Sequence, residues 1–208
     1  MNKRETVFHE LKEHLPFTFV ISLIVGGIVA WIFLVDATLI KYSEEFFDVL
    51  HPVHILFSAA ATSAIYYKYC KNLFQSIIIG IFGAILVGTI SDVLFPYISG
   101  NLFLLNTSFH LPIFEVPFLI LGVALVGSVA GIYFGGFKLS HNLHVLLSIL
   151  ASLFYLLAFS FEISLIAIFL ISLILFLFVF IPCCISDIVF PILFLKKPCR
   201  IHGQWHEH

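Results

Sequence analysis

Two histidine pairs with the same spacing are the side chains in this sequence best suited to chemistry. Each has the form His-x-x-His and is followed by a serine four residues on: His51, His54 and Ser58 in the first copy, and His141, His144 and Ser148 in the second. On a helix these positions share a face, so each copy directs two imidazoles and a hydroxyl the same way. Two imidazoles suit a divalent transition metal and need one or two more ligands. We therefore predict a metal site at each copy, the alternative being interfacial hydrogen bonds near a helix end.

A second motif, Ser-Asp-x-x-Phe-Pro, follows each histidine pair. It begins at Ser91 and Asp92 in the first copy and at Ser186 and Asp187 in the second. One interpretation is a helix-ending signal, because proline stops a helix and Ser or Asp satisfies free backbone groups. The helix dipole opposes an acidic residue near a C-terminal end, however, which favours a role as ligand. A helix hairpin would then bring each aspartate to the histidine pair of its own copy.

Further ligands are predicted to come from the opposite copy. Aligning the two copies at their first proline places His14 opposite Glu115, although both also fit ordinary interfacial positions. Two crossed sites near opposite membrane faces result. The outer site contains His51, His54, Asp92 and Glu115, and the inner site contains His14, His141, His144 and Asp187. Cys183 and Cys184 either add a soft thiolate to the inner site or pack as small apolar side chains.

The recurring motifs indicate a duplicated unit. Three cues recur in one order, at offsets of 101 (Pro16 and Pro117), 90 (His51 and His141) and 95 (Ser91 and Ser186). We divide the chain into a first repeat at 1–100, a second repeat at 101–195 and a histidine-rich cytosolic tail at 196–208. Three spans per repeat would insert the second copy upside down, a construction found in many secondary transporters.

The composition indicates an integral membrane protein. Hydrophobic residues make up 61% of the sequence and charged residues 11%, against roughly 25% charged in an average soluble domain. Six apolar stretches approach the roughly 17–25 residues that cross a bilayer as a helix. They are 16–35, 51–67, 73–95, 112–134, 141–161 and 165–190. The predicted fold is all-α, with six transmembrane helices in two inverted three-helix repeats.

The basic residues predict the orientation. A cytosolic N-terminus places nine of the ten Lys and Arg residues on the cytosolic side and leaves only Lys41 outside. We therefore expect a multi-pass protein of the plasma membrane with both termini cytosolic and free cysteine thiols. Its expected partners are the metal ion, the lipid bilayer and a second copy in a homodimer. The aqueous segments, including an acidic stretch at Glu44, Glu45 and Asp48, are too short for a catalytic domain or a nucleic-acid surface.

These features favour a small carrier for a divalent transition metal ion. Zinc is the first choice, and iron, manganese, cobalt, nickel and copper are the alternatives. Two other functions use the same residues. An intramembrane zinc hydrolase acting on lipid would use Ser58 or Ser148 to position its substrate, but two oppositely facing sites are redundant for catalysis. A proton-coupled carrier of an organic solute would use the histidines and aspartates without a metal.

Overall fold

The computed structural model describes residues 41–134, 137–161 and 190–194, with scattered single positions between 12 and 31 and at 182. For residues 137–142, 192 and 193 it describes the backbone alone. Within this part of the chain every regular element is helical, apart from an isolated β-bridge between Thr107 and Ser160. The all-α prediction is confirmed to this extent.

Three helical stretches are long and apolar enough to cross a membrane, as expected of a multi-pass membrane protein. They are Ser43–Cys70, Leu73–Leu102 and Pro117–Phe134, and a shorter apolar stretch covers Leu143–Phe159. These four correspond to the second to fifth predicted spans. The sixth predicted span, 165–190, falls almost wholly outside the described residues, and the first, 16–35, is described at scattered positions only.

The helix that carries the first histidine pair is longer than predicted. α2 (Ser43–Cys70) begins eight residues before His51, where the sequence placed the start of the span. Its first turn contains Glu44 and Glu45, whose negative charges suit the positive end of a helix dipole. The acidic stretch predicted as an aqueous loop is therefore helical, and His51 lies about two turns inside the helix.

The next span continues through the proline that was predicted to end it. α3 (Leu73–Thr89), the π-helical turn η2 (Ile90–Leu94) and α4 (Phe95–Leu102) follow one another without a break. In the π turn the Phe95 amide donates to the Ile90 carbonyl, five residues back. This shift of the hydrogen-bond register lets the helix accommodate Pro96, which has no amide hydrogen to donate.

The fourth predicted span is interrupted. α5 (Pro112–Glu115) is separated from α6 (Pro117–Phe134) by Val116, with φ −129° and ψ 55°. A residue that precedes proline is driven out of the helical region, which explains the break. α7 (Phe137–Phe159) carries the second histidine pair, and a short helix, α9 (Phe190–Leu193), follows later in the chain.

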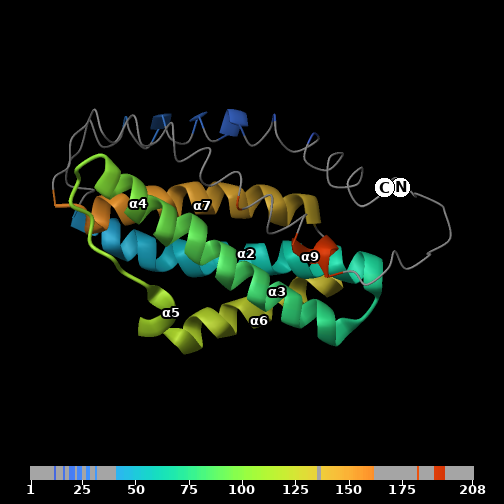
Figure 1. Ribbon diagram of the computed structural model, residues 1–208. Helices are drawn as coiled ribbons and strands as arrows, with labels where there is room; N and C mark the ends of the chain where they lie inside the picture. Colours follow the sequence, from blue (N-terminus) through green and yellow to red (C-terminus); the bar gives the residue numbers. More distant parts are fainter. Residues whose placement is uncertain are drawn as a thin grey trace.

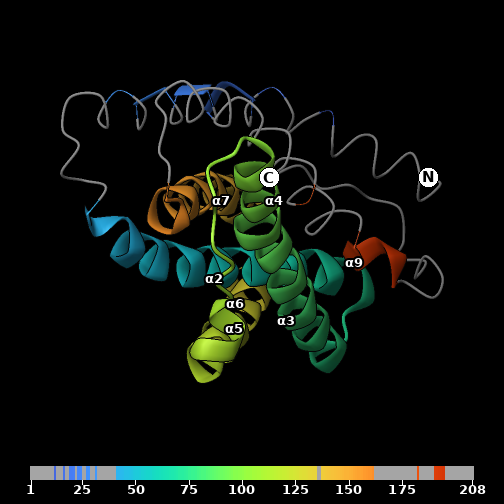
Figure 2. The ribbon, with the colours of Figure 1, turned by 60° about the vertical axis from the view of Figure 1, so that its left-hand side comes forward.

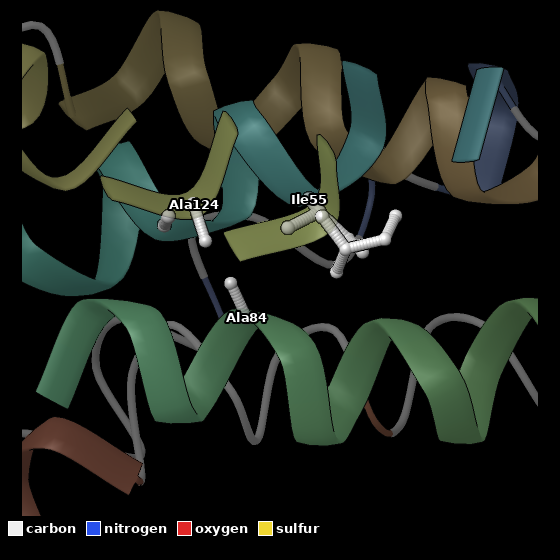
Figure 3. Packing of buried hydrophobic residues seen from close by; sticks show 5 residues of the cluster. Ile55, Ala84 and Ala124 are labelled. Carbon is white, nitrogen blue, oxygen red and sulfur yellow. The ribbon is translucent and has the colours of Figure 1, made fainter. Parts of the chain in front are cut away.

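α2 is the central helix, and α3, α6 and α7 pack around it (Figure 1 and Figure 2). Ile55 of α2, Ala84 of α3 and Ala124 of α6 meet in one buried cluster (Figure 3). The small side chains of Ala84 and Ala124 allow the helices to approach closely.

Glycines bring α6 against the backbone of α2. A Cβ atom at Gly127 would overlap the carbonyl oxygen of Leu56, and one at Gly131 would overlap that of Ala60. Only glycine therefore fits these two positions, which lie one helical turn apart as in other close helix crossings.

α7 runs antiparallel to α2 (Figure 1). Phe47 of α2 meets Tyr155 of α7 with ring centroids 5.2 Å apart, and His54, seven residues later on α2, meets His144, eleven residues earlier on α7, at 5.4 Å. The helices that carry the two histidine pairs thus share one interface.

Candidate metal centre

A buried carboxylate, Asp92, organises the candidate site. It belongs to the π turn η2 and has no solvent exposure. Its oxygens accept four hydrogen bonds: Oδ2 from Nδ1 of His51 (2.9 Å) and His54 (2.6 Å), and Oδ1 from the hydroxyls of Ser91 (2.8 Å) and Ser148 (2.6 Å). Four donors fill the acceptor positions of a carboxylate, so this polar group is satisfied without water.

Local structure explains how α2 and η2 meet. Only Lys71 and Asn72 separate α2 from α3, so the two helices form a hairpin that returns η2 to the level of the first histidine pair. His51 and His54 lie one turn apart on α2 and therefore reach the same carboxylate oxygen. The structure thus brings Asp92 to these two histidines, as the hairpin argument predicted.

A serine from α7 supports the π turn. In the π pattern the Ser91 carbonyl would accept from the amide of residue 96, but Pro96 has none. The Ser152 hydroxyl donates to this carbonyl at 3.0 Å. Ser152 was not among the predicted site residues, although it lies one turn beyond Ser148 on α7 and so extends the same polar face.

With both imidazoles neutral, as metal binding requires, the centre has a net negative charge. Within the described residues no lysine or arginine pairs with Asp92, whose ion-pair partners are His51 and His54. A carboxylate only accepts hydrogen bonds, so each histidine presents its proton at Nδ1 and, when neutral, a lone pair at Nε2. Two neutral imidazoles and one carboxylate carry a net charge of −1 among apolar helices, an environment that favours a cation.

These three residues can hold a metal ion. One potential ligand atom from each of His51, His54 and Asp92 lies within 4.8 Å of the others, and all three residues are buried. Two imidazoles and a carboxylate are a donor set that zinc uses in proteins. Nε2 of His54 is buried and has no hydrogen-bond partner within the described ranges. An orphaned lone pair of this kind is an available ligand.

Glu115, the fourth residue of the predicted outer site, does not join this group. Its carboxylate lies 3.0 Å from Nδ1 of His110, and its side chain is 53% exposed. The ring of Phe47 stacks on His51 at 5.4 Å and meets His110 edge-on at 6.0 Å. Phe47 therefore separates the surface pair from the buried centre, and three of the four residues predicted for the outer site lie together.

His144 lies beside a histidine of the predicted outer site. The sequence assigned it to the inner site, with His14 and Asp187, but its ring stacks on that of His54 at 5.4 Å and 27°. Both rings are buried. The two histidine motifs thus meet at one centre in the described part of the chain.

The other predicted residues divide into two groups. Ser58, a supporting residue of the first motif, is buried one turn beyond His54. The second group comprises the predicted inner-site residues other than His144. Outside the described residues lie His14, Cys183, Cys184, Ser186, Asp187 and the side chain of His141.

The donor set of the candidate centre comes from α2 and η2, and His144 and Ser148 of α7 lie against it. Searches of protein-family models, curated proteins and solved structures find no match to this chain.

Proposed function

We propose that this protein is a multi-pass membrane carrier for a divalent transition metal ion, with zinc as the first choice. The observation that carries the proposal is the buried group of His51, His54 and Asp92 within helices apolar enough to cross a membrane. Ionisable side chains at such depth are costly, and they mark ion pathways and proton relays in membrane proteins.

The packing of α2 and α7 supports two inverted repeats. The repeat offset of 90 makes His54 and His144 equivalent residues, and these two rings face one another. Equivalent residues of two antiparallel helices meet in this way when a local twofold axis passes between them. Six transmembrane helices, with repeats at 1–100 and 101–195, are the architecture we propose on this basis.

The chemistry of the centre suits both binding and release. An arriving cation is attracted by the net negative charge of the group, but it must compete with the four donors that already satisfy Asp92. Imidazole binds a metal only when neutral, so protons compete with the ion. Both effects keep the affinity moderate, which a carrier requires, and the second couples transport to protons.

The remaining predictions complete the proposal. We place the protein in the plasma membrane with both termini cytosolic, on the asymmetry of its lysines and arginines. A homodimer would enclose the pathway, and the tail at 196–208 would bind metal in the cytosol.

One observation favours a second candidate function. The carboxylate–imidazole contacts at 2.6 and 2.9 Å are hydrogen bonds suited to moving protons without a metal. A proton-coupled carrier of an organic solute is therefore the main alternative. A lipid hydrolase is less favoured, because Ser148, which was predicted to position a substrate, instead donates to Asp92.

Uptake by the full-length protein in proteoliposomes tests the proposal. We expect zinc uptake that is driven by a proton gradient and falls at least about tenfold in His54→Ala and Asp92→Asn. Glu44→Gln, which neutralises an exposed carboxylate at the start of the same helix, should transport at the wild-type rate. Proton flux without uptake of zinc, iron, manganese, cobalt, nickel or copper would overturn the metal carrier and favour the alternative.

A further inference from the structure

The two ring nitrogens of His54 have different environments. Nδ1 donates to Asp92 Oδ2 at 2.6 Å, whereas Nε2 is buried without a hydrogen-bond partner in the described part of the protein. Metal-binding histidines commonly use one nitrogen on the ion and donate the other N–H to a carboxylate, which fixes the tautomer and the orientation of the ring. His54 is already arranged in this manner, with Nε2 as the ligand atom.

The distances argue against Asp92 and Nδ1 of His54 as two ligands of one ion. Ligand atoms about 2.0–2.1 Å from a tetrahedral zinc lie about 3.3 Å apart. The Nδ1–Oδ2 separation of 2.6 Å is clearly shorter and is that of a charge-assisted hydrogen bond. Asp92 thus acts on the ion through the imidazole.

The separation of His54 and His144 matches that of two rings on one ion. A zinc–nitrogen distance of about 2.0–2.1 Å places each imidazole centroid about 3.2 Å from the metal, and a tetrahedral angle then places two centroids about 5.2 Å apart. The observed separation is 5.4 Å. Two rings at this separation can share one ion when the His144 ring turns about its Cβ–Cγ bond, while His54 keeps its Nδ1 bond to Asp92.

The carboxylate is also tied to the helix that carries His144. Ser148, one turn further along α7, donates to Asp92 Oδ1 at 2.6 Å. Asp92 therefore contacts both helices: it accepts from His54 of α2 and from Ser148 of α7. These two bonds help to set the position of the His144 imidazole relative to that of His54.

We infer that the transported ion is bound between the two histidine motifs, by Nε2 of His54 and the imidazole of His144, with Asp92 as a positioning residue. This inference rests on the proposed function and narrows its substrate class. A centre with two nitrogen ligands favours zinc, cobalt, nickel or copper over magnesium, calcium or manganese, which prefer oxygen. The ion would then bridge α2 and α7, one from each proposed repeat.

Cobalt(II) binding to the full-length protein in detergent tests the assignment, because the visible bands of cobalt report its geometry and ligands. We expect one tetrahedral site that zinc displaces and magnesium does not. His144→Gln and His54→Gln should each weaken cobalt binding about 100-fold or more, because each removes a nitrogen ligand. Asp92→Asn should weaken binding about 10–100-fold while keeping the wild-type spectrum, since the nitrogen ligands remain. His110→Gln, which changes a histidine outside the centre, is the matched control and should bind as the wild type.

His144→Cys provides a readout that a structural role would not give. A thiolate at this position should keep cobalt bound and add a sulfur-to-cobalt charge-transfer band that the wild type lacks. Wild-type affinity in His144→Gln, or a bound cobalt without that band in His144→Cys, would overturn the inference and leave the proposed function standing. A wild-type protein that binds no transition metal would overturn both. Circular dichroism and size-exclusion chromatography identify any variant that has lost its fold.

Discussion

Replacing Asp92 with asparagine should separate the contribution of this residue to the fold from its contribution to metal binding. Asparagine has nearly the same shape. Its Oδ1 can accept from Nδ1 of His51 and His54, while its Nδ2 donates to the Ser91 and Ser148 hydroxyls, which are able to accept. All four contacts of the carboxylate therefore keep a partner.

The expected change in stability is small because two effects oppose each other. Each hydrogen bond falls from about 1.5–3 kcal/mol to about 0.5–1.5 kcal/mol when the charge is removed, a loss of about 5 kcal/mol over four bonds. Burying a neutral amide instead of an ion avoids a desolvation penalty of several kcal/mol. We expect a melting temperature within a few degrees of the wild type. Zinc affinity should nevertheless fall about 10–100-fold, because the orienting carboxylate is lost.

Asp92→Leu is the matched contrast. Leucine leaves two imidazole N–H groups and the Ser148 hydroxyl without their acceptor, at about 1–3 kcal/mol each, so this variant should be destabilised by several kcal/mol, whereas the Ser91 hydroxyl can still donate to the Gly88 carbonyl at 3.3 Å. Thermal unfolding followed by circular dichroism, with calorimetric zinc titration, measures both properties. An asparagine variant that unfolds as easily as the leucine variant would show that the charge holds the fold. Unchanged zinc affinity in Asp92→Asn would refute any role for the carboxylate in binding.

Three further predictions concern packing, the inter-helix contact and pH. Gly131→Ala should destabilise the protein by about 3 kcal/mol, because its Cβ overlaps the Ala60 carbonyl oxygen, whereas Gly122→Ala on the same helix has open space and should be neutral or slightly stabilising in the same unfolding assay. Ser148→Ala should cost about 1.5–3 kcal/mol, and a loss below about 0.5 kcal/mol would contradict its bond to Asp92. Zinc binding measured by calorimetry should weaken at least about tenfold from pH 7 to pH 5, since protons compete for imidazole, and a flat profile would exclude histidine ligands.

The contact between Asp92 and the first histidine pair was predictable because it is local. Two residues connect α2 to α3, and so short a link leaves few arrangements other than a hairpin. The hairpin brings the end of one span to the start of the other, and the i, i+3 spacing aligns both imidazoles with the returning carboxylate. Apolar stretches of sufficient length likewise indicated the membrane helices.

The π turn at Ile90–Leu94 was not predictable, because no residue pattern distinguishes it from a helix that ends at proline. The sequence showed Pro96 and suggested a terminator. Pro96 leaves the Ser91 carbonyl without an amide partner, and Ser152 of α7, sixty-one residues after Ser91, donates to this carbonyl instead. The helix can therefore continue past the proline. Such long-range compensation depends on the packing of α7, which a local pattern cannot contain.

His54 lies deep within α2, and this depth favours one shared metal centre over two separate sites at opposite membrane faces. A motif at the end of a helix would lie far from its equivalent in an inverted copy, at the opposite membrane face. His54, however, follows Ser43 by eleven residues and precedes Cys70 by sixteen, so it lies about 16 Å and 24 Å along the axis from the two ends. Because the antiparallel helix α7 passes at this depth, the equivalent His144, about two turns inside α7, meets His54 well away from the ends of α2. An ion bound there would be reached from either face by rearranging one repeat against the other, whereas two separate surface sites would require it to cross the apolar interior between them.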